Sequence, residues 1–117
     1  MQFATITPSI KLSLSPAPDC ADAVFGPGIA SLCRGVAETG SLNKAAKDMG
    51  MAYSKAWRII KEAEESFGVQ LLDRNGAHGS TLTADGAALL ETYDKLQADV
   101  ASYARERLKA IAQEAFC

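Results

Sequence analysis

The chain has 117 residues, a length that suits one domain with a single modest core. Its 48% hydrophobic and 22% charged residues are typical of a folded protein and exclude a disordered one. No run of about 18 apolar residues predicts a transmembrane helix, and the N-terminus lacks the basic start and apolar stretch of a signal peptide. We therefore expect a cytoplasmic protein with no membrane partner.

The residues that usually build catalytic or metal sites are scarce. Cys20, Cys33 and Cys117 are widely spaced, and His78 is the single histidine. A structural zinc site takes four ligands in paired spacing, and no nucleophile–base spacing or glycine-rich phosphate loop is present. We expect free thiols, no metal, no cofactor and no catalytic residue, so the sequence does not predict an enzyme.

A strand is predicted near the N-terminus. Residues 9–15 alternate polar and apolar side chains, so that one face carries Ile10, Leu12 and Leu14. This alternation is the period of a half-buried strand, and prolines bracket it. A single strand needs a partner, which has to come from later in the chain.

Three helices joined by short turns are predicted next. The first, residues 28–39, ends at Gly40 and has a buried stripe formed by Ile29, Leu32, Cys33, Val36 and Ala37. The second, residues 42–49, can be capped by the Ser41 hydroxyl and ends in a glycine turn. The third runs from residue 52 or 53 to 67, with a core face of Ala56, Ile59, Ile60, Ala63 and Phe67.

Positive charge gathers on the second and third helices. Residues 41–61 hold five cations against one anion, although the whole chain carries a net charge of −2. Glu62, Glu64 and Glu65 follow, and we interpret them as a solvated helix end. A short helix, a turn and a longer basic helix are the pattern of a helix-turn-helix, which lays its second helix in the major groove of DNA. Because the total charge is acidic, we expect modest, strongly salt-dependent phosphate affinity.

A β-hairpin is predicted after the third helix. Residues 69–74 and 80–83 are short β-like runs, and the Asn75-Gly76 pair between them is a strong hairpin signal. A helix-turn-helix followed by a β-hairpin is a winged helix. The strand at residues 10–14 is a candidate third member of this small sheet.

The last predicted helix begins at residue 84, where Thr83 can cap it, and continues to about residue 115. At ~30 residues it would be roughly 45 Å long, more than a domain of this size can cover. A sustained apolar seam usually pairs with another helix, and this seam comprises Leu89, Tyr93, Leu96, Val100, Tyr103, Leu108 and Ile111. Packing on the chain's own domain suits the first two turns better than the last four. We therefore predict a homodimer formed through this helix.

Together these elements predict a mainly α protein with a small β-sheet. Residues 1–83 would form a winged helix-turn-helix DNA-binding domain, with an N-terminal strand, three helices and a wing. Residues 84–117 would form a long C-terminal dimerisation helix. Double-stranded DNA and a second copy of the chain are the expected partners.

Residues 25–96 resemble the DNA-binding domain of ModE-type molybdate-responsive regulators, especially their short single-domain relatives. The likeness rests on several short matches: Gly26-Pro27-Gly28, ETGS at 38–41, Ala45-Ala46, GMAYS at 50–54, Ala56-Trp57 and Leu82-Thr83-x-x-Gly86. The last of these is also shared with LysR-type regulators. The resemblance implies a dimeric winged-helix transcription factor, with the third helix in the major groove and the wing on the neighbouring backbone or minor groove.

Two departures from that family change the expectations. The wing, residues 74–79, is short, whereas the family often has a longer glycine-rich loop with basic residues, so we expect fewer wing contacts. Full-length ModE proteins also carry C-terminal molybdate-binding modules, for which this chain has no room after the long helix. We therefore expect no molybdate binding within this chain.

The resemblance and the charge pattern together indicate DNA contacts on the third helix. Arg58 and Lys55 are the best candidates for base edges, because arginine can bond two acceptors on guanine at once; a solvated helix face is the alternative. Ser54 can bond a phosphate or base, or only help to cap the helix. Tyr53 can reach a phosphate or bury its ring, and Trp57 is expected to pack between helices rather than act as a stacking platform.

Further candidates flank that helix. Ser41 and Lys44, at the start of the second helix, would lie near phosphates, as would Lys47. Arg74 and His78 belong to the wing, where one cation can enter a narrow minor groove.

Two classes of function follow. The first is a sequence-specific DNA-binding transcriptional regulator that acts as a homodimer. The alternative is a winged-helix adaptor for proteins or small ligands without strong DNA binding, which the acidic total charge and the short wing favour. A weaker third hypothesis is a thiol sensor that uses Cys33 or Cys117.

Overall fold

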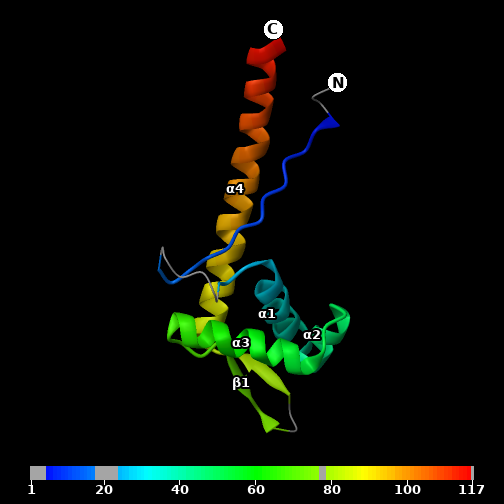
Figure 1. The fold of residues 1–117 in the computed structure, drawn as a ribbon, viewed down its shortest axis with the longest axis vertical. Helices are drawn as coiled ribbons and strands as arrows, with labels where there is room; N and C mark the ends of the chain where they lie inside the picture. Colours follow the sequence, from blue (N-terminus) through cyan, green and yellow to red (C-terminus); the bar gives the residue numbers. More distant parts are fainter. Residues whose placement is uncertain (1–4, 18–23, 77–78, 117) are drawn as a thin grey trace.

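The computed structural model describes residues 5–17, 24–76 and 79–116. Its elements are α1 (Pro27–Thr39), α2 (Leu42–Asp48), α3 (Tyr53–Phe67), β1 (Leu72–Arg74), β2 (Ser80–Leu82) and α4 (Ala84–Phe116). The first three helices and the wing form a head, and α4 projects from it as a shaft (Figure 1). This confirms the predicted winged helix-turn-helix with a long C-terminal helix.

Helix α1 is set by proline at its start and glycine at its end. Pro27 occupies the first turn, and Gly40 ends the helix in the left-handed conformation, at φ 74°. Four of the five predicted stripe residues are buried, but Ala37 is exposed. Ala30 is buried in its place, at 1% exposure, so the buried face lies slightly to one side of the predicted stripe.

The turn between α1 and α2 follows the predicted capping. The Ser41 hydroxyl accepts a hydrogen bond from the Lys44 backbone N–H at 3.0 Å. Helices α1 and α2 approach so closely that a Cβ added to Gly35 would lie only 2.6 Å from the Ala45 Cβ. Ala45 and Ala46 are both buried, so small side chains are what the packing of the helix-turn-helix requires.

Helix α3 buries its predicted core face. Ala56, Ile60 and Ala63 are fully buried, and Ile59 and Phe67 pack against the same core. The wing after it is a two-stranded antiparallel sheet in which Leu72 pairs with Leu82 and Arg74 with Ser80. The first strand is shorter than the predicted run from residue 69.

The N-terminal segment corrects one prediction: residues 10–14 are not a third strand of the wing sheet, which has two strands within the described residues. Leu14 instead forms an isolated bridge with Phe25, and residues 5–14 run beside α4 (Figure 1). The carbonyl of Leu12 accepts the Tyr93 hydroxyl at 3.0 Å, and that of Ile10 accepts the Gln97 side-chain amide at 3.1 Å. Leu12 and Leu14 of the predicted apolar face pack against the core, whereas Ile10 is 41% exposed. Side chains of a helix take the place of the predicted strand partner. We call residues 5–14 the N-terminal arm.

Helix α4 has two halves with different surroundings. Thr83 caps it by accepting the Gly86 N–H at 2.9 Å, and Leu90 and Tyr93 are buried in the head. Arg34 of α1 pairs with Asp94 at 2.6 Å. Beyond residue 97 no side chain of the described helix is fully buried. The molecule measures 62 × 31 × 22 Å because this outer half extends away from the head.

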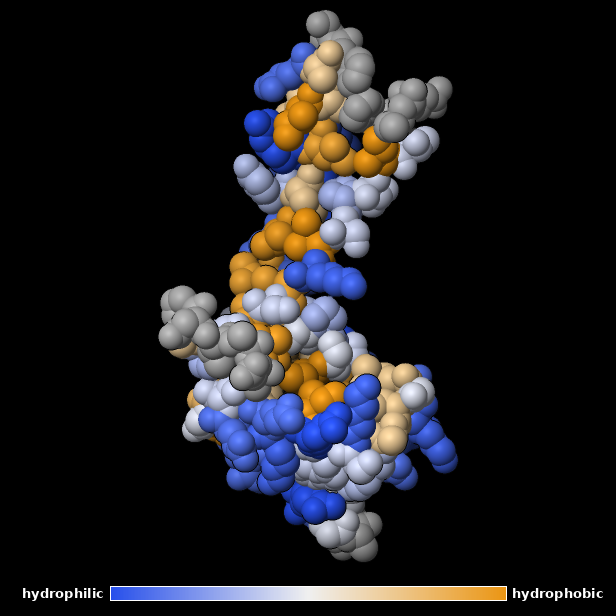
Figure 2. Space-filling model, viewed as in Figure 1, coloured by the Kyte–Doolittle hydropathy of each residue, from blue (hydrophilic) through white to orange (hydrophobic). Residues whose placement is uncertain are grey.

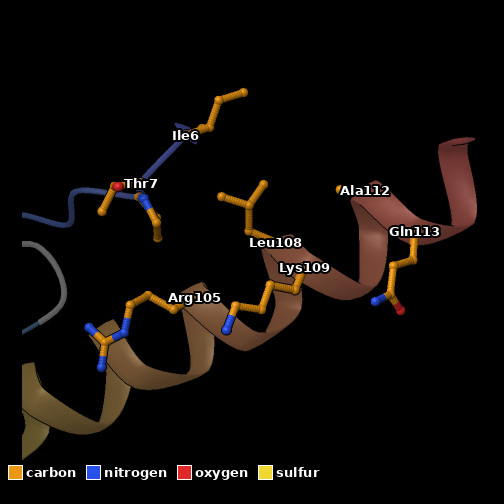
Figure 3. A pocket seen from close by; sticks show the side chains of 8 residues that line it. Ile6, Thr7, Arg105, Leu108, Lys109, Ala112 and Gln113 are labelled. Carbon is orange, nitrogen blue, oxygen red and sulfur yellow. The ribbon is translucent and has the colours of Figure 1, made fainter. Parts of the chain in front are cut away.

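The outer half of α4 carries apolar surface. Figure 2 shows hydrophobic side chains along the shaft, whereas hydrophilic ones dominate the visible lower face of the head. A groove of about 430 Å³ lies between the arm and the outer half, with Leu108 on one wall and Ile6 on the other (Figure 3). None of the described helices is both long and apolar enough to cross a membrane.

Candidate nucleic-acid interface

The exposed side of α3 is made of two adjacent rows of side chains. Residues at i and i+4 share a row on a helix, so Tyr53, Trp57 and Lys61 form one row and Ser54 and Arg58 the next. The first row lies beside the wing, since it contacts Arg74 of β1. Ser54 and Arg58 are exposed, as is Lys55 on the far side of that second row.

Lys55 and Arg58, on the exposed side of α3, are free to meet a partner. Neither Lys55 nor Arg58 makes a hydrogen bond or ion pair with another residue in the part of the chain that the structure describes. Arg58 therefore offers all five guanidinium N–H donors to an external acceptor. Such side chains can either contact DNA or stay solvated, which are the two alternatives that the sequence leaves open.

The wing and the two helix starts enclose a small hollow. Its volume is about 190 Å³, and it is lined by Ser41, Leu42, Asn43, Tyr53, Arg74, Gly76, Gly79 and Ser80. The structure thus brings together three predicted site residues from three elements: Ser41 before α2, Tyr53 on α3 and Arg74 on β1. Hydroxyl and guanidinium donors around one hollow are suited to a phosphate-sized anion.

Arg74 is held against α3. Its Nη2 donates a hydrogen bond to the Tyr53 hydroxyl at 3.2 Å, and its guanidinium carbon lies 4.6 Å from the centre of the Trp57 ring. Tyr53 and Trp57 meet edge to face, with 6.4 Å between ring centres. Trp57 therefore joins α3 to the wing, and it also packs against the core of the head.

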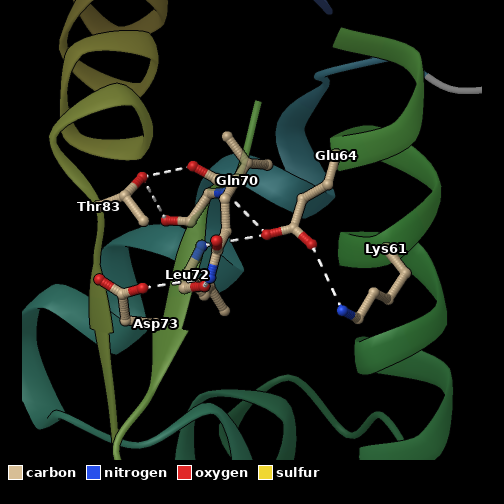
Figure 4. Close-up of polar contacts among 7 residues, drawn as sticks. Lys61, Glu64, Gln70, Leu72, Asp73 and Thr83 are labelled. Carbon is tan, nitrogen blue, oxygen red and sulfur yellow. Dashed lines mark hydrogen bonds and ion pairs between the residues drawn. The ribbon is translucent and has the colours of Figure 1, made fainter. Parts of the chain in front are cut away.

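Glu64 is a second link between α3 and the wing. Its Oε2 accepts the backbone N–H groups of Leu71 at 2.7 Å and Leu72 at 3.3 Å, while Oε1 lies 3.9 Å from Lys61 Nζ (Figure 4). The Glu64 side chain is only 11% exposed. The prediction of a solvated helix end is therefore wrong for Glu64, although Glu65 is exposed. The paired strand begins at Leu72, later than predicted.

The remaining predicted residues occupy the edges of this surface. Lys44 and Lys47 are exposed on α2. His78 lies outside the described residues, as do Cys20 and Cys117. Cys33 is buried in α1, and burial raises the pKa of its thiol to about 12, which leaves almost no thiolate near neutral pH. This disfavours Cys33 as a thiol sensor.

Three contributors to the surface were missed from the sequence: Asn43, Glu64 and the platform role of Trp57. The spacing Tyr53–Trp57–Lys61 does indicate a row of aromatic and basic side chains. Nothing local indicates that a cation 17 residues after Trp57 would lie over it. Glu64 and Leu71 are seven residues apart across a helix end, where no periodic pattern connects them.

The chain matches known proteins in sequence and in fold. Residues 31–87 match the family model for the bacterial regulatory helix-turn-helix protein, lysR family. A crystal structure of CbnR_DBD in complex with DNA aligns with a TM-score of 0.58 and 31% identity, over 72% of this chain and 94% of that one. The chain belongs to the lysR family of bacterial regulatory helix-turn-helix proteins.

The curated relatives are transcriptional regulators, and they include ModE, as the resemblance predicts. The DNA-binding transcriptional dual regulator ModE of Escherichia coli (strain K12) is 36% identical over 70 residues, 56% of this chain. The HTH-type transcriptional regulator CrgA of Neisseria meningitidis serogroup B is 37% identical over 73 residues, 62% of this chain. The chain spans about a quarter of the length of these relatives, 27% of ModE and 24% of CrgA.

Proposed function

We propose that this protein is a sequence-specific DNA-binding transcriptional regulator that acts in the cytoplasm as a homodimer. The observation that carries the proposal is the free, exposed row of Ser54 and Arg58 with Lys55 beside it, next to a hollow that holds Arg74. Its relatives support the proposal, since CbnR_DBD was solved with DNA and ModE and CrgA are described as transcriptional regulators.

In the proposed complex, α3 enters the major groove. Arg58 and Lys55 would read base edges, and Arg58 can bond guanine at two acceptors. Ser41, Lys44 and Arg74 would bind phosphates on either side, which fixes the orientation of α3 without adding sequence information. Lys61 contributes less, because it already lies 3.9 Å from the Glu64 carboxylate.

The homodimer would form through the outer half of α4. Leu96, Tyr103 and Ile111 are exposed by 40%, 67% and 47%, and Val100 and Leu108 are half-buried. Leu89 and Tyr93, also predicted for this seam, pack in the chain's own core instead. The proposed interface therefore begins near Leu96.

The test is binding to DNA fragments selected by the wild-type chain from a random duplex pool. The double variant Lys55→Ala, Arg58→Ala should bind at least tenfold more weakly, because each base contact is worth about 1–3 kcal/mol. The double variant Lys95→Ala, Arg105→Ala removes the same charge from α4 and should bind like wild type. Anisotropy titrations at low and moderate salt would measure both. Selection of no fragment, or equal affinity of the two double variants, would refute the proposal.

A winged-helix adaptor is the second candidate. The net charge of −2 favours it, because a DNA-binding domain is usually basic. An adaptor has no reason to keep Lys55 and Arg58 unpaired on one face of α3. The same titration therefore separates the two functions, since an adaptor would give no salt-dependent binding to any selected duplex.

A further inference from the structure

Arg74 is unusually well fixed for an exposed wing residue. It is the last residue of β1, and its side chain crosses to α3, where it meets two aromatic rings. A guanidinium carbon 4.6 Å from a ring centre is within the range of a cation–π contact. The hydrogen bond to Tyr53 uses one guanidinium N–H, so the others stay available beside the hollow.

Trp57 is suited to hold this cation. It is half-buried and packs against the core of the head, so its ring has little freedom. Tyr53 meets the ring edge to face, with 6.4 Å between ring centres, and Arg74 lies over the ring at 4.6 Å from its centre. Lys61 Nζ also lies 5.8 Å from the ring centre. The Trp57 ring is therefore a fixed surface on α3 rather than a group reaching outward.

We infer that Trp57 is a positioning residue for Arg74. It holds the guanidinium at a set place beside α3, so that the wing and α3 present one continuous surface to the phosphate backbone. A free arginine side chain would lose its rotamer freedom on binding, whereas a stacked one has already lost it. This inference rests on the DNA-binding function proposed above and assigns the wing phosphate contact to Arg74 through Trp57.

A double-mutant cycle tests this assignment with the selected duplex as probe. Trp57→Leu keeps an apolar side chain but removes the aromatic face, and it should weaken binding about 2- to 30-fold, the range of a cation–π contact. Trp57→Phe keeps an aromatic face and should recover most of the affinity. In an Arg74→Ala background, Trp57→Leu should cause almost no further loss.

The cycle separates positioning from a merely structural role. If Trp57→Leu weakens binding by the same factor with and without Arg74, Trp57 does not act through Arg74 and the inference fails while the proposed function stands. If wild type binds no duplex, both fail. Thermal unfolding of each variant shows how much of any loss comes from the stability of the head.

A second measurement needs only the Arg74 variant. The chain has one tryptophan, so its fluorescence reports on this ring alone. Arg74→Ala should red-shift the emission and increase acrylamide quenching, because removing the guanidinium exposes the ring to water. Arg105→Ala is the control and should leave the spectrum unchanged. An unchanged spectrum in Arg74→Ala would contradict the stacked arrangement.

Discussion

The two halves of α4 have the same kind of apolar spacing but different surroundings. In the inner half, Tyr93 is 4% exposed, meets Phe25 edge to face and donates its hydroxyl to the Leu12 carbonyl. In the outer half, Tyr103 is 67% exposed. A helix of 33 residues would be about 50 Å long, so the head covers only its beginning. The spacing thus shows which face is apolar, but not which molecule covers it.

The N-terminal arm covers only part of the surface of α4. It follows α4 outward from Tyr93 to the groove at Leu108, and it occupies one side of the helix (Figure 1). The side with Leu96, Tyr103 and Ile111 stays open. The arm therefore leaves one apolar face of the outer half available for the proposed second copy.

The largest expected effect compares the two tyrosines. Tyr93→Ala removes a buried ring from the core, and it should lower the free energy of unfolding by about 3–5 kcal/mol, as large-to-small aromatic substitutions do. Tyr103→Ala, at an exposed position, should change the stability of the monomer by less than about 0.5 kcal/mol. Urea unfolding at low protein concentration measures both. Equal losses would mean that Tyr103 packs within its own chain.

The second prediction concerns the proposed dimer. Leu96→Asp with Ile111→Asp would place charges in the seam, and it should raise the dimer dissociation constant at least about 100-fold, because unpaired buried charges are costly. Ala98→Asp with Gln113→Asp adds the same two charges at exposed positions of α4 away from the seam, and it serves as the matched control. Sedimentation velocity over a concentration series distinguishes monomer from dimer. A wild-type chain that stays monomeric at all concentrations would refute the seam.

The smallest effect is expected at the border of the two halves. Gln97→Ala removes the hydrogen bond to the Ile10 carbonyl and should cost about 0.5–1.5 kcal/mol. Hydrogen exchange at residues 9–12 should become faster, because the arm loses the Gln97 side-chain bond to α4. Gln113→Ala, farther out, is the control. Unchanged exchange in Gln97→Ala would show that the Gln97 hydrogen bond does not hold the arm in place.

Local signals predicted most of the fold. Ser41 and Thr83 cap helices as expected, Gly40 ends α1, and the Asn75-Gly76 pair lies between paired strands. These features depend on neighbours in sequence, so one residue type at one position indicates them. The division into two domains between residues 83 and 84 stays a prediction. The first turns of α4 belong to the core of the head.

Contacts between distant segments were harder to predict. Alternation marked Leu12 and Leu14 as half-buried, yet it could not show that Leu12 would bond to Tyr93 of α4 and Leu14 to Phe25. The same holds for the site: the free cations Lys55 and Arg58 follow from helical spacing, whereas the stacking of Arg74 on Trp57 depends on where the wing folds back. The DNA-contact residues stay predictions.

The most direct test of the account is a hydroxyl-radical footprint of the wild-type chain on a selected duplex. A homodimer with α3 of each copy in the major groove should protect two patches on one face of the DNA. Their centres should lie about 10–10.5 base pairs apart, or a multiple of this. A single protected patch, or two patches on opposite faces of the duplex, would contradict the proposed dimer.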